Sequence, residues 1–235
     1  MDIEKIREYE KYGDIYVEKY LRQNTDELRT NWWEAFKFFL GCAFMRGRRD
    51  ELSVKFRDKA FLALEDLLGD SLEKKTIKLG EIVSTQDLIK DKLRHNGVNN
   101  RGDRQVTLES LLFINDIEDH NVVHHALDRI NDHRICLLYQ ELKYIKYIGP
   151  KLASFFIRDI VLLYNLGDKL LPEEYTVIQP VDTWVRKAAI KTGLIDESFT
   201  DERAMKKIAI GCRQVGIDPA RFNAGAWYYN SQLKR

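Results

Sequence analysis

The apolar residues of this chain recur at intervals of three and four along most of its length, which is the spacing of amphipathic helices. The strict alternation of apolar and polar positions that a half-buried strand needs does not extend over useful lengths. Only four prolines occur in 235 residues, and none of them falls in a long apolar run. The pattern therefore predicts an all-α fold.

The predicted helices follow one another from the N-terminus nearly to the C-terminus. An amphipathic helix over residues 3–22 precedes one that Asn31 caps and that ends near residues 41–46, and a third runs from about 50 to 68 and stops at Gly69. Further helices are expected at residues 85–92, 101–114, 122–131, 182–192, 201–215 and 219–232. The loop at 165–179 is rich in Leu, Tyr and Ile, so we expect it to pack down onto the helices.

The segment 142–164, LKYIKYIGPKLASFFIRDIVLLY, predicts a helix, a tight hairpin at 147–150 and a second helix. The first N–H groups of a helix are unpaired and attract anions, so the hairpin is a candidate phosphate grip. Lys151 lies in the first turn, where a cation is locally disfavoured. Such a lysine is a solvated side chain, a ligand for phosphate, or an amine that attacks carbon in its neutral form. The local sequence leaves these three roles open.

Asp182 lies 31 residues after Lys151 (182 − 151), in the sequence QPVDTW ahead of another predicted helix. An aspartate in this place is explained by N-capping alone. A capping aspartate is also held in a fixed orientation, so it can in addition stabilise positive charge on a substrate. The phosphate-gripping hairpin, the lysine and the later aspartate together indicate chemistry on a nucleic acid.

Two of these segments resemble the helix-hairpin-helix DNA glycosylases, the HhH-GPD superfamily of endonuclease III. The family form is Leu-Pro-Gly-Val-Gly-x-Lys-x-Ala followed by Val-Asp-Thr-x-Val-x-Arg, and residues 145–153 and 181–186 are similar to its two halves. Weaker similarity at 38–53, 91–103 and 222–229 extends the resemblance over about residues 30–232. It implies a two-lobed helical fold with an active-site cleft between the lobes. Lobe A would comprise about 30–40 and 183–235 with the N-terminal helix 1–29, and lobe B about 41–182 with the hairpin.

Members of this superfamily with a lysine after the hairpin are typically bifunctional DNA glycosylase/AP lyases of base-excision repair. The resemblance implies that Lys151 attacks C1′ of a flipped nucleotide, forms a Schiff base and nicks the strand by β-elimination, with Asp182 ionised beside it. Three alternatives stay open. They are a monofunctional glycosylase in which Lys151 only contacts phosphate, an endonuclease III-like enzyme for oxidised pyrimidines, and a non-catalytic helix-hairpin-helix DNA-binding protein.

The chain departs from the family form in three ways. Tyr147 replaces the first hairpin glycine, so either the turn is less standard or the tyrosine contacts DNA. The lysine-to-aspartate span is longer than in endonuclease III and similar to that of the archaeal 8-oxoguanine glycosylases. Cysteines occur only at 42, 136 and 212, without the spacing of an iron–sulfur signature, and we expect them to be buried thiols. These departures favour 8-oxoguanine as the substrate and an enzyme that needs no cofactor and has no iron–sulfur cluster.

The resemblance also implies further site residues. The expected DNA contacts are Tyr147, Gly149 and Pro150 in the hairpin, Arg46, Arg48 and Arg49 as wedge candidates, and Asn99 and Asn100 toward the opposite strand. The candidates for the base pocket are Phe155, Trp227 and Trp33, although core packing is the default for a buried aromatic ring. Turn chemistry explains the asparagines equally well. Backbone carbonyls of Lys143, Ile145 and Ile148 are candidates to hold a monovalent cation, K⁺ or Na⁺.

Composition adds little to this picture. The net charge is +1, so any attraction to DNA must come from local basic segments such as residues 46–49. With 44% hydrophobic and 32% charged residues, a charged N-terminus and no apolar run of membrane length, we expect a soluble protein. Its expected partner is damaged DNA, not a membrane. We expect a monomer in the cytoplasm or nucleoid.

Overall fold

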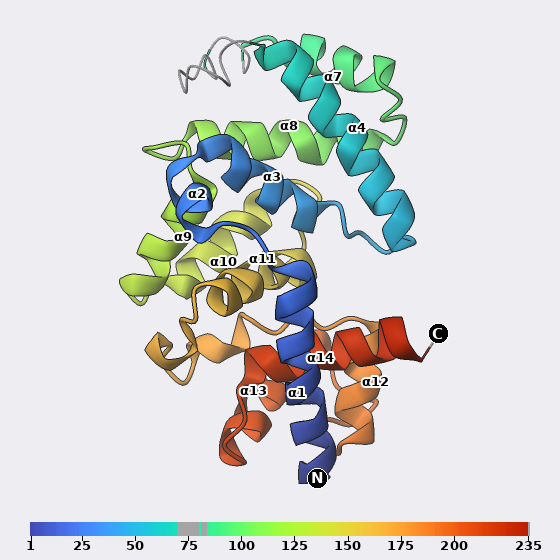
Figure 1. Cartoon of the computed structure of the whole chain (residues 1–235), viewed down its shortest axis with the longest axis vertical. Coiled ribbons are helices and arrows are strands. Elements are labelled where there is room, and N and C mark those ends of the chain that lie inside the picture. The colour runs from blue at the N-terminus through green and yellow to red at the C-terminus, as the bar shows by residue number, and fades with distance from the viewer. Residues whose placement is uncertain (70–79, 81–83, 235) are drawn as a thin grey trace. The chain divides into compact units, whose positions relative to one another are not determined.

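The computed structural model describes residues 1–69, 80 and 84–234, and every regular element among them is helical (Figure 1). The helices are α1 (Ile3–Tyr20), α2 (Thr25–Thr30), α3 (Trp32–Ala43), α4 (Asp50–Leu68), α7 (Gln86–His95), α8 (Arg101–Asn115), α9 (Val122–Asn131), α10 (Ile135–Tyr144), α11 (Pro150–Leu163), α12 (Thr183–Lys191), α13 (Asp201–Gln214) and α14 (Pro219–Tyr228). Short 3₁₀ turns occupy Gly167–Lys169 and Glu174–Thr176, and a π-helical turn, Tyr229–Leu233, follows α14. The predicted all-α class is confirmed for this part of the chain.

The helix ends follow the capping residues that the sequence places there. The Asn31 side chain accepts a hydrogen bond from the Trp33 N–H at 3.1 Å and starts α3, as predicted. Gly69, with a left-handed φ of 47°, ends α4 as predicted. Helix α2 is an addition, because TDELRT buries only Leu28 and is too short to show a periodic apolar face.

The hydrophobic loop between α11 and α12 packs down as expected. Leu166, Leu170 and Ile178 are buried. The Tyr175 hydroxyl donates to the Gly167 carbonyl at 2.6 Å, which ties the two 3₁₀ turns together. None of the helices that the structure describes is long and apolar enough to cross a bilayer.

The residues group into two compact units. Unit 1 comprises Met1–Gln23, Asp128–Gln140 and Ala153–Arg235, and unit 2 comprises Asn24–Leu127 and Glu141–Leu152. These boundaries differ from the predicted lobes, which placed residues 30–40 with the C-terminal helices. Helix α3 belongs instead to unit 2, because its Trp33 ring packs against Phe61 of α4 at 6.3 Å and Phe39 meets Phe113 of α8 at 6.5 Å. The predicted active-site cleft stays a prediction.

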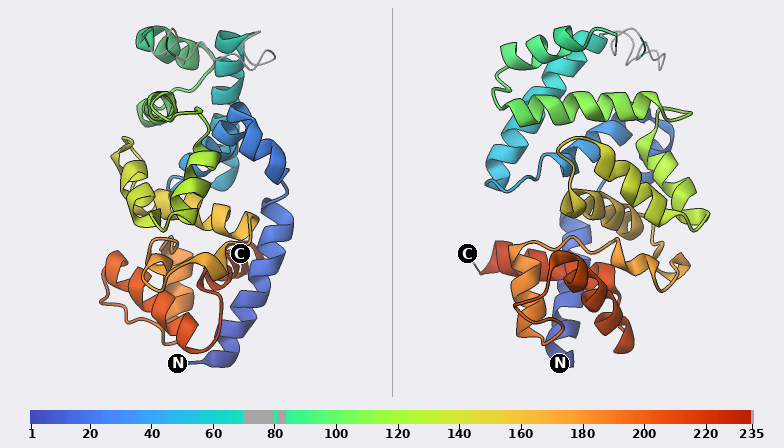
Figure 2. Two further views of the ribbon diagram at one scale, coloured as in Figure 1. Left: turned by 90° about the vertical axis from the view of Figure 1, so that its left-hand side faces the viewer. Right: turned by 180° about the vertical axis from the view of Figure 1, so that it is seen from behind.

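Unit 1 is built around the close crossing of α1 and α14, which lie side by side (Figures 1 and 2). A Cβ atom on Gly225 would lie 1.8 Å from the Tyr9 carbonyl oxygen, and one on Gly13 would lie 2.3 Å from the Arg221 carbonyl oxygen. Two backbones can approach this closely only where no side chain intervenes. Residue 225 therefore has to be glycine for the C-terminal helix to reach its place.

Unit 2 has its own core, in which α3 contacts α4 and α8. Phe36, Phe39 and Phe44 are fully buried there. Helices α4, α7 and α8 are mutual neighbours (Figure 2). This arrangement places the segment between α7 and α8 at the surface of unit 2, where Asn99 and Asn100 are exposed.

Candidate nucleic-acid interface and lysine–aspartate pair

The hairpin between α10 and α11 is a tight turn. Tyr147 has φ = 73°, in the left-handed region that favours glycine. The Ile148 N–H donates to the Ile145 carbonyl at 2.9 Å and closes the turn. Tyr147 occupies the position of the first glycine in the glycosylase form, so the chain adopts the backbone of a glycine turn with a tyrosine.

Gly149 immediately precedes α11, and the space beside its Cα atom is open. Its φ is not in the left-handed region, and a Cβ atom built on it would meet nothing within 4 Å. Neither backbone conformation nor packing inside the chain therefore requires glycine at this place. Pro150 occupies the first helical position, which it favours because it lacks an N–H. The open face beside the helix start is free for a ligand to approach the backbone.

Lys151 lies in the first turn of α11 and is half-buried. Within residues 1–69, 80 and 84–234, its ammonium group has no hydrogen-bond or ion-pair partner. A partly buried amine without an acidic partner is available to a ligand. The hydrogen bonds leave open whether that ligand is water, a phosphate or an electrophilic carbon.

Asp182 caps α12, as the sequence predicts. Its Oδ1 accepts hydrogen bonds from the Trp184 and Val185 N–H groups, both at 2.9 Å. Oδ2 makes no hydrogen bond within the described part of the chain. The carboxylate is thus fixed in orientation with one oxygen uncommitted. Asp182 belongs to unit 1 and Lys151 to unit 2.

A buried polar network in unit 1 was not foreseen from the sequence. The Arg158 side chain is 2% exposed, and its Nε and Nη2 donate to Asp159 Oδ1 at 3.0 and 2.7 Å. Its Nη2 also donates to the Tyr16 hydroxyl at 2.8 Å, and that hydroxyl donates to Asp159 Oδ2 at 2.9 Å. Burial raises the pKa of the Asp159 carboxyl, while the Arg158 charge and the hydrogen bonds from Arg158 and Tyr16 oppose this rise. The signal in the sequence is the adjacent Arg-Asp pair inside an otherwise apolar helix.

This network reaches the segment that carries Asp182. Arg158 Nη1 donates to Asn223 Oδ1 at 3.0 Å, and Asn223 Nδ2 donates to Gln179 Oε1 at 3.2 Å and to the Pro180 carbonyl at 3.3 Å. Gln179 and Asn223 are fully buried. The residues just before Asp182 are therefore tied to α11 and α14 by side chains that water does not reach.

Two of the three aromatic candidates keep part of their surface exposed in unit 1. Phe155 is half-buried, with the Arg158 guanidinium 4.8 Å from its ring centroid. Trp227 is half-buried and packs edge-on against Tyr16 and Tyr20, each at 5.8 Å. Trp33 is only 6% exposed and stacks on Phe36 at 5.6 Å in unit 2. The core interpretation therefore fits Trp33, whereas Phe155 and Trp227 are partly exposed.

The arginines expected as wedges have different surroundings. Arg46 Nη2 and Arg48 Nη1 bind the two oxygens of Asp103 at 2.9 and 2.6 Å, and the Asp103 side chain is fully buried. Arg46 also donates to the Gly102 carbonyl at 3.2 Å, and its guanidinium lies 5.3 Å from the Tyr147 ring centroid. Arg46 and Arg48 are thus bound within unit 2, because a buried carboxylate requires their charge, and their role as wedges stays a prediction.

Arg49 alone of the three keeps a side chain without a partner among the described residues. It is exposed at the residue that precedes α4. Asn100 caps α8, since its Oδ1 accepts from the Asp103 N–H at 3.2 Å, so turn chemistry accounts for it. Asn99 is exposed, and its backbone carbonyl accepts a hydrogen bond from Arg104 Nη1 at 2.7 Å, so its side chain is not used in that bond. Arg49 and Asn99 are therefore the stronger candidates for DNA contacts.

The three cysteines and the carbonyls of the hairpin are the groups considered as ligands for a cluster or a cation. Cys42 and Cys212 are buried as expected, but Cys136, at the start of α10, is exposed, contrary to the expectation. Within the described ranges, no group of three or more His, Cys, Asp or Glu side chains could hold a metal ion. Of the carbonyls expected to hold a monovalent cation, that of Ile145 already accepts the Ile148 N–H.

No protein-family model, no curated protein and no solved structure matches this chain. The resemblance to the glycosylases therefore depends on sequence alone, mainly on residues 145–153 and 181–186.

Proposed function

We propose that the protein is a bifunctional DNA glycosylase/AP lyase of the helix-hairpin-helix type, with 8-oxoguanine as the favoured lesion. The observation that carries the proposal is the left-handed backbone of Tyr147, φ = 73°. A non-glycine residue in this region costs roughly 1–2 kcal/mol. The chain keeps a glycine-type turn at that cost, directly before Gly149, which has open space beside it, and Lys151, which has no partner among the described residues. This combination supports a turn that was selected for function.

Lys151 would be the nucleophile. Its Nζ forms a bond to C1′ of the flipped nucleotide as the bond from C1′ to the base breaks, and the base leaves with a proton. Nζ then gives up a proton, and O4′ takes up a proton as the C1′–O4′ bond breaks, which opens the sugar ring and leaves the C1′=Nζ Schiff base. Removal of a C2′ proton then expels the 3′ phosphate, which nicks the strand by β-elimination. No cofactor is needed for any of these steps.

Asp182 would stabilise the positive charge that develops on the sugar. Its capped Oδ1 fixes the carboxylate, and its uncommitted Oδ2 is the oxygen that meets the substrate. The network of Arg158, Asn223 and Gln179 would act on catalysis only through the position of Asp182.

The hairpin would hold a phosphate beside the lesion. The open face at Gly149 allows close approach to the backbone, and the Lys143, Ile145 and Ile148 carbonyls would share a K⁺ or Na⁺ ion with that phosphate. Phe155 and Trp227 would form the walls for the flipped base, and Arg49 would fill the gap it leaves.

Borohydride trapping on a duplex with a single 8-oxoguanine tests the nucleophile. We expect the wild type to give a covalent protein–DNA complex, Lys151→Gln to give none, and Asp182→Asn to trap at least about tenfold more slowly. Lys206→Gln is the matched control, since Lys206 is an exposed lysine on α13. Equal trapping by Lys151→Gln and the wild type would contradict the proposal.

Base release, strand scission and binding, measured on the same duplex, distinguish the alternatives. Release of the base by Lys151→Gln without trapping indicates a monofunctional glycosylase. Binding without base release or scission on any lesion indicates a DNA-binding protein without catalysis. If the protein cuts at oxidised pyrimidines but not at 8-oxoguanine, the proposed mechanism stands and the proposed substrate is wrong.

A further inference from the structure

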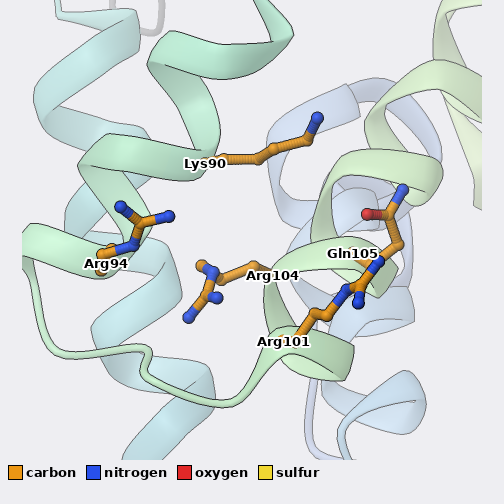
Figure 3. A pocket seen from close by; sticks show the side chains of 5 residues that line it. All are labelled: Lys90, Arg94, Arg101, Arg104 and Gln105. Carbon is orange, nitrogen blue, oxygen red and sulfur yellow. The ribbon is translucent and has the colours of Figure 1, made fainter.

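A pocket of about 310 Å³ in unit 2 is lined by Lys90, Arg94, Arg101, Arg104 and Gln105 (Figure 3). Four of its five lining side chains are cationic and none is acidic. The whole chain carries a net charge of only +1, so this concentration of positive charge is local.

Two neighbouring helices direct these side chains to the same place. Lys90 and Arg94 are four residues apart on α7, and Arg101 and Gln105 are four residues apart on α8, so each pair shares one helix face. Arg104 comes from the same turns of α8 and lies opposite Arg94 (Figure 3). Helices α7 and α8 pack against each other, which brings the two faces together.

The positive charge is only weakly compensated inside the protein. Lys90 pairs with Asp87 at 3.2 Å and Arg94 with Asp91 at 3.4 Å, but these acids are 95% and 69% exposed, and exposed pairs contribute little. Arg101 is exposed and has no ion-pair partner among the described residues. On α8, Asp103 is bound by Arg46 and Arg48, and Glu109 accepts a hydrogen bond from the Gln105 amide at 2.7 Å.

Two of these arginines lie at the start of a helix, which is an unfavourable place for a positive charge. Arg101 and Arg104 lie in the first turn of α8, where the helix dipole disfavours cations and favours anions. Arg104 is nevertheless held in place, because its Nη1 donates to the Val98 and Asn99 carbonyls at 2.8 and 2.7 Å. An arrangement that is unfavourable for folding alone becomes favourable when an anion is bound.

We propose that this pocket binds successive phosphates of a DNA strand and is a second DNA contact besides the hairpin. The inference takes DNA as the partner from the proposed function. Two helices carry the cations in rows, and guanidinium groups bind phosphate through paired hydrogen bonds, so the pocket suits an extended backbone better than a single ion. The exposed Asn99, whose carbonyl holds Arg104, lies next to the same strand in this arrangement.

The test is the salt dependence of binding to an undamaged duplex, measured by fluorescence anisotropy. The variant is Lys90→Ser with Arg101→Ser, because neither side chain bonds to the backbone. The control is Lys206→Ser with Lys207→Ser, which removes the same charge from exposed positions on α13. We expect the slope of log K against log salt to become shallower by about 1–2 in the variant, with about a tenfold loss of affinity at low salt, and to change little in the control.

Equal slopes for the variant and the control would overturn the proposal. So would a variant that loses binding of inorganic phosphate but keeps the DNA slope, because the pocket would then serve a small anion. Thermal unfolding of the variant checks that it folds. Borohydride trapping by the wild type separates the two proposals: a protein that does not trap but shows the slope change keeps the pocket and loses the proposed Schiff-base chemistry of Lys151.

Discussion

Two buried aspartates, Asp159 in unit 1 and Asp103 in unit 2, each bind arginine, but their surroundings differ. Arg158 is 2% exposed, and its partners Asp159, Tyr16 and Asn223 are buried with it. The two arginine side chains on Asp103 are each 18% exposed, so water reaches one side of that cluster. The closed network holds the segment before Asp182, whereas the half-open cluster lies against Tyr147 of the hairpin.

The Asp159 network and the Asp103 cluster therefore hold their neighbouring residues in different ways. In the closed network every partner is fixed by another buried group, so the removal of one member leaves others without hydrogen bonds. In the half-open cluster an arginine that loses its carboxylate can turn to water. We therefore expect unit 1 to hold Asp182 rigidly and the arginine turn of unit 2 to remain adaptable.

The largest effect is expected from Arg158→Met. It leaves Asp159 buried with a raised pKa and without its cation, and loss of one member of a buried ion pair typically costs about 3–5 kcal/mol. Urea unfolding measures the loss. Arg134→Met, an exposed position in unit 1, is the control and should change stability by less than about 0.5 kcal/mol. A loss below about 1 kcal/mol in Arg158→Met would mean that the network is not closed to water.

A smaller effect is expected from Asp103→Asn. The substitution removes the charge that Arg46 and Arg48 bind, but both guanidinium groups can be solvated, so we expect a loss of about 1–3 kcal/mol in urea unfolding. Asp116→Asn, exposed at the other end of α8, is the control. If Asp103→Asn costs as much as Arg158→Met, the contrast between the two clusters fails.

The sequence predicted those structural features that depend on residues a few positions away in the chain. The cap of Asp182 follows from residues two and three positions away, and the ends of α3 and α4 likewise follow from local chemistry. The roles of Arg46 and Arg158 depend on partners 57 and 142 residues away, and no local pattern distinguishes an arginine for DNA from one for a buried carboxylate. The exposed Arg49 and the bound Arg46 are alike in sequence and differ only in the folded chain.

The smallest effect concerns the turn at Tyr147, and it separates strain from contact. Tyr147→Ala and Tyr147→Gly both remove the ring that faces the Arg46 guanidinium at 5.3 Å, but only glycine adopts φ = 73° without strain. We expect Tyr147→Gly to be more stable than Tyr147→Ala by about 1 kcal/mol in urea unfolding. Equal stabilities would show that the turn relaxes when the ring is removed, in which case the tyrosine itself maintains the left-handed backbone. A stability of Tyr147→Ala at or above that of the wild type would instead show that the ring adds nothing to folding, because alanine keeps the strained backbone, and this would favour a role for the ring in binding DNA.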